Sequence, residues 1–507
     1  MGSRTVIRRA IERYGVSESN RPDIVLVTTD QQRADATARE GFSLDTTPFL
    51  DSLAAQGTWF DRAYTPTPVC CPARVSLLTG RFPSATCVRS NAAAERAQYN
   101  QDLFAVLTDA GYTTALVGKN HSHLTRDRAD HWYELSHWGA NGANSRRDRT
   151  AKDEAFESWI DGLGWSPSAE PTPFPACCQS VVRAVSAAVE WIASLNDGPF
   201  FLWLSIPEPH NPYQVPEPYF SRFPPDDLPE PHAGPDALAE KGFRWKWSRR
   251  LAERRVADRH PDADYAAFLQ RMRANYYGML RLIDDQLERF VNALETAGRW
   301  HDTLLVCTSD HGDFAGEYGL MRKGVGTLPE ATTRVPLLVH GPGVRSSDDP
   351  CSAHASLVDL LPTLCSACGI DVPRGVQGRN LWPFLAGATD RLDGFGSVYA
   401  EAGVGGSRRR PDDAPPIEEA LPNELNPITQ SGTTAMVRKE NMKLVFDADD
   451  RRRLYDLSTD PAELADRYDD PEYADDRANL LETALTWTLS VRNDTSPVSA
   501  LGDGPSE

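Results

Sequence analysis

One apolar segment near the N-terminus constrains the fold more than any other feature of the chain. Asp23–Thr29 reads DIVLVTT, a β-branched run without polar alternation, and it stops at Asp30. A run of this kind is typical of a strand that is buried on both faces, as in parallel sheets covered by helices on each side. We therefore expect this strand to belong to an α/β fold.

The segments that follow alternate between strand and helix patterns. A helix is predicted from Thr47-Pro48 to Gly57, with a proline in its first turn and a glycine at its end. A longer helix is predicted over Asp264–Ala297, where apolar residues recur at helical spacing. Further strands are predicted at Thr113–Val117, Phe200–Ile206, Leu304–Thr308 and Val335–Val339. Strands alternating with helices predict a largely parallel sheet between two helix layers.

The sequence pattern changes after about residue 385. A Pro- and Glu-rich loop is followed by three short strand patterns, Ala435–Val437, Lys443–Phe446 and Arg453–Tyr455. One helix is expected after Asp460-Pro461 and another over Asp475–Leu489. We predict an N-terminal tail (1–20), a large α/β domain (21–385) and a smaller α+β domain (386–507) with a short antiparallel sheet and a frayed end from Asn493.

Charge and hydropathy limit the partners of the chain. The 507 residues carry a net charge of −19, which disfavours binding to nucleic acid by phosphate neutralisation. The first 20 residues lack the apolar core of a secretory signal, and no apolar run approaches the roughly 18 residues that cross a bilayer. We expect a cytoplasmic protein that binds neither nucleic acid nor membrane. An anionic substrate would need a local concentration of positive charge.

The nine cysteines do not predict a disulfide framework, because their number is odd and the chain is long. Cys365 and Cys368 form a CxxC, which could bind zinc or perform redox chemistry. They lie in the apolar run LVDLLPTLCSACGI, with no second CxxC or histidine pair beside them. A buried helix is therefore the favoured interpretation of this pair.

Polar residues follow two of the predicted strands. Asp30-Gln31 ends the first strand, and Asp310-His311 ends the strand Leu304–Thr308. Ligands of α/β sheets bind beyond the carboxyl ends of strands. Two carboxylates, an amide and an imidazole are suitable ligands for a divalent cation, although each pair alone could be ordinary polar chemistry at a strand end.

A cysteine motif gives these residues a context. Residues 68–81 read PVCCPARVSLLTGR, in which Cys70-x-Pro72-x-Arg74 is followed by LTGR; Cys71 does not fit the same register. The motif resembles that of the formylglycine-dependent sulfatases of the alkaline phosphatase-like superfamily. Segments containing Lys119 (GKNH), His210 (PHNP) and Lys323 (SDHGDFAGEYGLMRKG) match the family in the same order, as does LYDLSTDPAEL from Leu454.

The resemblance implies an alkaline phosphatase-like sandwich and a sulfuric ester hydrolase that releases inorganic sulfate and an alcohol. It implies that a formylglycine-generating enzyme oxidises Cys70 to an aldehyde, whose hydrate is the nucleophile. It assigns the metal to Asp30, Gln31, Cys70, Asp310 and His311. It implies that Arg74 orients the hydrate, and that Lys119 and Lys323 supply the positive charge that binds the anionic ester. It implies that His121 is the base of the elimination step and that His210 protonates the leaving oxygen.

Two pairs depart from the commonest sulfatase pattern. Asp30-Gln31 replaces paired aspartates, and Asp310-His311 replaces Asp-Asn, which resembles the choline sulfatase and phosphonate monoester hydrolase branch. An amide in place of a carboxylate and an imidazole in place of an amide lower the negative charge of the site, and they shift the expected cation from Ca²⁺ towards Mn²⁺ or another transition metal. A phosphonate monoester or phosphodiester hydrolase is therefore the alternative function, and an inactive binding relative is disfavoured by the complete set of polar residues.

The native substrate and the oligomeric state are not encoded in a readable motif. Three segments are candidates for substrate specificity. They are Ser90-Asn91, Gly139–Asn144 and the insert Pro212–Pro261, which is rich in proline, arginine and tryptophan. The insert could line the binding cleft, or it could be a solvent-exposed segment of the surface with no role in binding.

Overall fold

The computed structural model describes residues 21–137, 150–324, 326–420, 423–447 and 452–492. The predicted tail 1–20, the loop Gly139–Asn144 and the end from Asn493 lie outside these ranges. A search of the described residues finds no helix that is long and apolar enough to cross a membrane.

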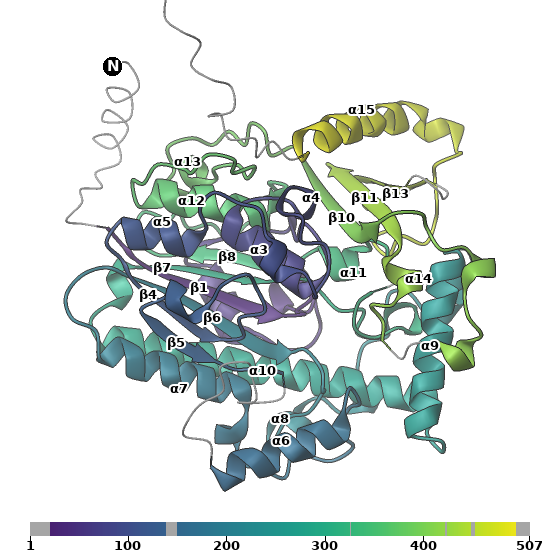
Figure 1. Cartoon of the computed structure of the whole chain (residues 1–507), viewed down its shortest axis with the longest axis horizontal. Helices are drawn as coiled ribbons and strands as arrows, with labels where there is room; N and C mark the ends of the chain where they lie inside the picture. Colours follow the sequence, from purple (N-terminus) through teal and green to yellow (C-terminus); the bar gives the residue numbers. More distant parts are fainter. Residues whose placement is uncertain (1–20, 138–149, 325, 421–422, 448–451, 493–507) are drawn as a thin grey trace, which may run out of the picture.

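A seven-stranded sheet forms the centre of the larger part of the molecule (Figure 1). Its order is β2-β8-β7-β1-β6-β4-β5, and β1, β4, β5, β6 and β7 run parallel. β8 is antiparallel to β7, and β2 is antiparallel to β8. The strands are β1 (Asp23–Asp30), β2 (Thr58–Trp59), β4 (Thr113–Gly118), β5 (His131–Glu134), β6 (Phe200–Pro209), β7 (Thr303–Ser309) and β8 (Leu337–His340). The predicted mixed, mainly parallel sheet is confirmed.

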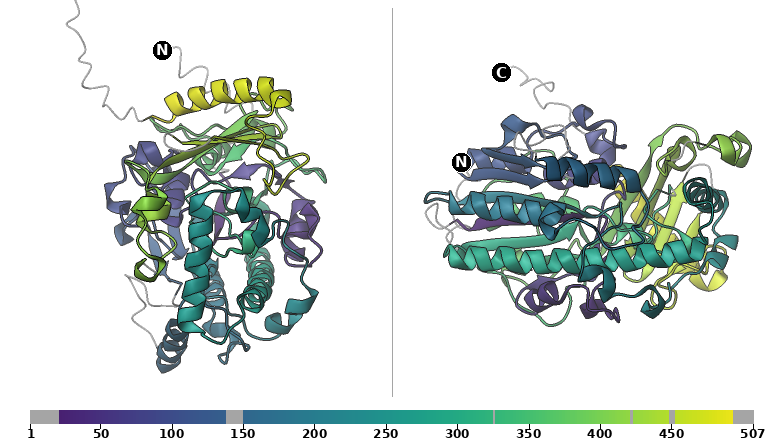
Figure 2. Two further views of the ribbon diagram at one scale, coloured as in Figure 1. Left: turned by 90° about the vertical axis from the view of Figure 1, so that its right-hand side faces the viewer. Right: turned by 90° about the horizontal axis from the view of Figure 1, so that it is seen from below.

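Both faces of β1 are covered by helices, as its continuous apolar run predicts (Figures 1 and 2). Val25 and Val27 belong to a core cluster with α7 (Ser180–Ala193) and α10 (Tyr265–Thr296). The alternate residues of β1 belong to a cluster with α3, α5 and α12 on the opposite face. These helices span Cys70–Thr79, Leu103–Asp109 and Leu360–Ala367. The strand therefore lies in the middle layer of a three-layer sandwich.

Seven further helices and one small sheet complete this part of the described chain. The helices are α2 (Pro48–Ala54), α4 (Pro83–Thr86), α6 (Ala151–Leu163), α8 (Tyr219–Arg222), α9 (Phe243–Arg259), α11 (Glu330–Thr333) and α13 (Trp382–Leu385). β3 (Ala63–Tyr64) pairs with β9 (Ala355–Ser356). Cys365 and Cys368 are buried at the end of α12, and the Tyr112 hydroxyl donates to Cys368 Sγ at 3.1 Å. Their setting is that of core residues.

A four-stranded antiparallel sheet forms the C-terminal part, with α15 (Ala474–Ser490) across it (Figure 1). Its strands are β10 (Ser397–Gly405), β11 (Gly432–Lys439), β12 (Met442–Asp447) and β13 (Arg453–Asp456), with α14 (Pro427–Gln430) between the first two. The predicted helix after Asp460-Pro461 is wrong. The Asp460 carboxylate instead accepts from the backbone N–H groups of Leu464 and Ala465 at 2.9 and 2.7 Å, which favours a turn.

Ion pairs join helix α11 to the C-terminal sheet. Glu330, at the start of α11, accepts from Arg438 at 3.0 Å and from Lys443 at 2.8 Å, and both cations lie on the C-terminal sheet. The Tyr64 hydroxyl donates to the same carboxylate at 2.7 Å. These contacts cross the predicted boundary at residue 385, and that division of the chain stays a prediction.

Candidate active site

Two parallel neighbours, β1 and β7, bring the predicted polar pairs together. Thr29 pairs with Ser309 in register, so Asp30 and Asp310 follow at the same edge of the sheet. The Asp310 N–H donates to the Thr29 carbonyl at 3.1 Å, and the Gln31 N–H donates to Asp310 Oδ1 at 3.1 Å. Helix α10 supports this edge, since the Tyr276 hydroxyl donates to the Gln31 carbonyl at 3.0 Å.

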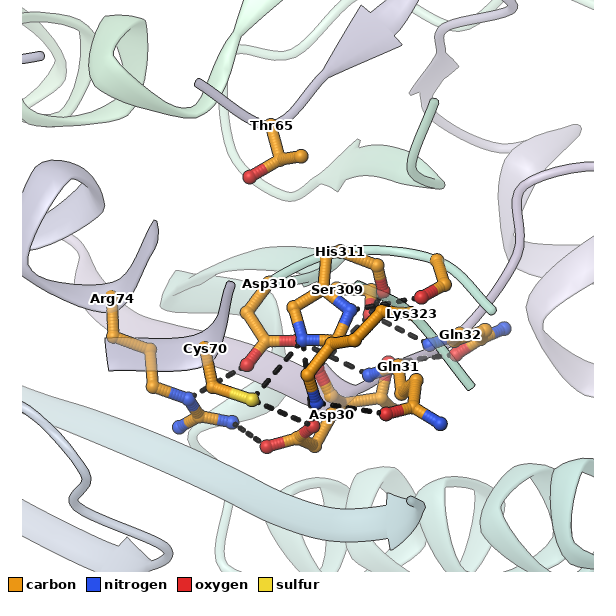
Figure 3. A network of polar contacts seen from close by, with 12 residues as sticks. Asp30, Gln31, Gln32, Thr65, Cys70, Arg74, Ser309, Asp310, His311 and Lys323 are labelled. Atoms are coloured by element: carbon orange, nitrogen blue, oxygen red, sulfur yellow. Dashed lines mark hydrogen bonds and ion pairs between the residues drawn. The ribbon is translucent and has the colours of Figure 1, made fainter. Parts of the chain in front are cut away.

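Four buried side chains form a cluster at this edge (Figure 3). The possible ligand atoms of Asp30, Cys70, Asp310 and His311 all lie within 4.8 Å of one another. Cys70 Sγ lies 3.1 Å from His311 Nε2 and 3.6 Å from Asp30 Oδ1. Two carboxylates and an imidazole around one point match the donor set of a divalent cation, so the residues present fit such an ion.

Helix α3 places Cys70 in the cluster and keeps Cys71 out of it. Cys70 is the first residue of the helix, whereas Cys71 packs against Val75 and Val88. Burial and Asp30 raise the pKa of the Cys70 thiol, but Lys119, Lys323 and His311 outweigh them and bring that pKa well below its usual value. Burial raises the pKa of Cys71 to about 12. Of the two adjacent thiols, Cys70 therefore ionises more readily and is the more nucleophilic.

Arg74 lies one helical turn after Cys70 and joins the two carboxylates. Its guanidinium is fully buried, with Nε 2.8 Å from Asp310 Oδ2 and Nη2 3.2 Å from Asp30 Oδ2. Nη1 donates to Ser205 Oγ at 2.6 Å. A planar group with several fixed donors can hold two carboxylates at a constant separation, which a lysine could not do.

Gln31 lies beside the cluster, but its amide is engaged elsewhere. Its Oε1 accepts from Lys323 Nζ at 3.0 Å, and its Nε2 donates to Asp313. Asp313 also accepts from the Tyr213 hydroxyl at 2.8 Å. The structure thus brings Gln31 and Lys323 to the site as a pair, and the assignment of Gln31 as a metal ligand stays a prediction.

A second group of cationic and imidazole side chains faces Asp30. Lys119 Nζ forms a close ion pair with Asp30 and lies 2.7 Å from His137 Nε2. The His137 ring stacks on His210, with centroids 3.7 Å apart and an interplanar angle of 16°. Burial, together with neighbouring cations, lowers the pKa of both histidines well below the usual value, so both rings are neutral near pH 7.

Sequence reasoning missed His137. It follows β5 in the segment HWYELSH, which carries no motif, and only the fold brings it to Lys119.

The structure does not link His121 to the cluster by any described hydrogen bond; its Nδ1 is buried and has no partner among the described residues. Its assignment as a base therefore stays a prediction. His123 and Glu317, which the sequence left unassigned, pair with Asp102 and Arg33 away from the cluster.

The fold and this cluster are those of an alkaline phosphatase-like hydrolase: carboxylates and an imidazole at the ends of parallel strands face a cysteine at the start of a helix. A family model described as sulfatase matches residues 22–370. The chain belongs to the sulfatase family, and it is a sulfuric ester hydrolase.

Two relatives support the family, and a solved structure supports the fold. An arylsulfatase of Clostridium perfringens is 25% identical and covers 94% of this chain and 95% of its own length. The multifunctional alkaline phosphatase superfamily protein PehA of Trinickia caryophylli is 27% identical, with 93% and 96% covered. The phosphonate monoester hydrolase of Agrobacterium radiobacter has the same fold, with a TM-score of 0.73, 24% identity and coverage of 93% and 96%.

Proposed function

We propose that this enzyme hydrolyses a sulfate ester through a formylglycine derived from Cys70 and a divalent cation. The observation that supports the proposal is the position of Cys70, the cysteine of the CxPxR motif, among Asp30, Asp310 and His311. These three side chains and residue 70 would hold the cation. When present, the cation and the aldehyde hydrate supply a Lewis acid and an oxygen nucleophile whose second hydroxyl permits release of sulfate.

The remaining roles belong to side chains of this chain. Arg74 fixes the separation of the two carboxylates, so the nucleophile and the ester meet in a constant geometry. Lys119 and Lys323 bind the anionic ester and stabilise the charge of its transition state. His210, which is neutral in the free enzyme, would give a proton to the leaving oxygen once the bound anionic ester raises its pKa, and His121 accepts a proton in the elimination step.

The donor set favours manganese over calcium as the cation. Calcium sites in proteins consist of oxygen ligands, whereas His311 offers an imidazole nitrogen. Metal analysis of the purified enzyme should give about one equivalent of manganese, and recovery of activity by the metal-free enzyme with Ca²⁺ but not with Mn²⁺ would contradict this choice.

A phosphonate monoester or phosphodiester hydrolase is the second candidate. The Asp-Gln and Asp-His pairs favour it, and the relative PehA bears a name that describes it as multifunctional. Turnover of 4-nitrophenyl sulfate, a 4-nitrophenyl phosphonate monoester and bis(4-nitrophenyl) phosphate should be compared on one preparation. We expect the largest kcat/KM for the sulfate, and a larger value for either phosphorus substrate contradicts the proposal.

The adjacent cysteines provide a matched test of the nucleophile. Protein produced together with a formylglycine-generating enzyme should show an aldehyde at position 70 and a thiol at position 71 in peptide mass spectrometry. Cys70→Ala should abolish turnover, and Cys71→Ala should keep most of it, because only Cys70 contacts the cluster. Full activity of the unmodified thiol, or an essential Cys71, would refute the mechanism.

A further inference from the structure

A small cavity borders the site and is not used by the proposed reaction. Helix α9, from the Pro212–Pro261 insert, forms one wall, and residues 320–323 and Glu424 form others. About 30 Å³ is open to the centre of a water-sized sphere. One water needs about 10–15 Å³ by this measure, so the cavity has room for a group of a few atoms. Lys323 lines the cavity and also reaches Gln31 Oε1 at 3.0 Å, which connects the cavity to the site.

Positive charge exceeds negative charge around this cavity. Arg322 pairs with Glu424 at 2.8 Å, whereas Arg255 lies 3.7 Å from the same carboxylate, beyond hydrogen-bond distance. The Arg255 guanidinium also lies over the ring of Trp165, 4.6 Å from its centroid. Burial and the neighbouring Arg322 lower the pKa of Arg255 to about 10. Two largely buried arginines thus share one carboxylate.

Several buried polar atoms of the residues that line the cavity lack partners. Arg255 Nε, Arg322 Nε and Ser248 Oγ are buried without a hydrogen-bond partner among the described residues. Glu424 Oε2, which lies 3.7 Å from Arg255 Nη1, is also buried without a hydrogen-bond partner among the described residues. Buried donors without acceptors are costly and rare in folded proteins. Lining residues with three unpaired donors, together with an excess of positive charge, suit a ligand group that is anionic and rich in acceptors.

We propose that this cavity is a subsite for a second anionic group, a carboxylate or a sulfate, carried by the part of the substrate that leaves as the alcohol. The inference rests on the proposed sulfate-ester hydrolysis and narrows its substrates to esters with two anionic groups. Arg255 and Ser248 would donate to that group, and Lys323 would lie between it and the reacting ester. Arg255 is thus a specificity residue that does not touch the reacting atoms.

The test compares matched aryl sulfates on fully modified enzyme. The 3- and 4-carboxyphenyl sulfates are compared with the 3- and 4-carbamoylphenyl sulfates, whose second group is uncharged. The disulfates of benzene-1,3-diol and benzene-1,4-diol then show whether a sulfate or a carboxylate is the preferred second group. Release of sulfate gives kcat/KM for each. We expect at least one anionic substrate to exceed its uncharged counterpart by tenfold or more.

Two variants should move this preference in opposite directions. Arg255→Gln should lower the ratio of anionic to uncharged kcat/KM by about tenfold, because a guanidinium contact is lost. Glu424→Gln should raise the ratio several-fold, because it removes the carboxylate that competes for the arginines. Arg250→Gln, which changes an exposed arginine of α9, is the control and should leave the ratio of anionic to uncharged kcat/KM unchanged.

The outcomes separate this inference from the proposed function. General damage to the fold would reduce all kcat/KM values and the Tm without moving the ratio in opposite directions. Equal ratios in the wild type and both variants, or a wild type without preference for any anionic substrate, would overturn the subsite. Failure to hydrolyse any sulfate ester, with the aldehyde at position 70 verified by mass spectrometry, would instead overturn the proposed function.

Discussion

Glu208, at the end of β6, should make the stability of the protein depend on pH in an unusual direction. Its side chain is buried, and Oε1 accepts from the Val181 N–H at 3.1 Å, while Oε2 has no partner among the described residues. Burial raises the pKa of this carboxyl group from 4.5 to about 7. The folded protein therefore retains a proton that the unfolded chain releases above about pH 4.5.

The sign and size of the effect follow from linkage. Because the folded state binds more protons than the unfolded state between about pH 4.5 and 7, stability decreases as the pH rises through this window. The difference between the two pKa values corresponds to about 3 kcal/mol, all of it lost above about pH 7. Glu208→Gln keeps a neutral side chain of similar shape. It should therefore match the wild type near pH 5 and be more stable by up to about 3 kcal/mol at pH 8.

Thermal unfolding of both proteins between pH 5 and 8.5 provides the assay. The Tm of Glu208→Gln minus that of the wild type should increase with pH by a few degrees. Glu288→Gln, which changes an exposed glutamate of α10, should show a difference that is flat across the range. If the Glu208→Gln difference stays constant or shrinks as the pH rises, the carboxyl group is ionised in the folded protein and the argument from burial fails.

Three further predictions concern the cluster. Arg74→Lys should lower kcat/KM roughly 10–100-fold together with metal content, because a point charge cannot hold both carboxylates; activity and metal analysis on the same sample would check this. His137→Phe keeps a ring against His210 but removes the acceptor for Lys119, so kcat/KM should fall about tenfold with unchanged Tm; an unchanged kcat/KM would show that His137 has no part in holding Lys119. Removal of divalent cations by a chelator should abolish turnover and lower the Tm of the wild type. Asp310→Asn should respond less to the chelator, and an equal response would place the ion elsewhere.

Five strands of the main sheet could be predicted because they are apolar runs, whereas β2 (two residues) and β5 (HWYE) carry no such signal and were not predicted. Asp23–Thr29 carries enough β-branched residues to identify a strand buried on both faces, and β1 has that position. β10 gave no such signal, since Ser397–Gly405 contains two glycines and a buried glutamate. The error after Asp460 has a different cause: a side chain that accepts from two backbone N–H groups competes with the helix that Pro461 would otherwise begin.

The candidate site was predictable only where a residue belongs to a motif. Asp30, Cys70, Asp310 and His311 converge as expected because motif residues follow strands or begin a helix. The stacking of His137 on His210 depends on the path of the chain after β5, for which the local sequence carries no signal. The cavity beside Lys323 likewise depends on tertiary packing of α9 against residues 320–323.

The burial of Cys70 limits the time in which it can be modified. In the folded protein its side chain is 1% exposed, and the histidine against it comes 241 residues later in the chain. At a synthesis rate of about 5–20 residues per second, a ribosome needs roughly 12–50 s to add those residues. Until then β7 and its carboxyl end do not exist, and the cysteine is accessible on the nascent chain. An enzyme that makes the proposed formylglycine has at least that interval in which to act, so slower translation beyond codon 70 should increase the fraction of aldehyde in the purified protein.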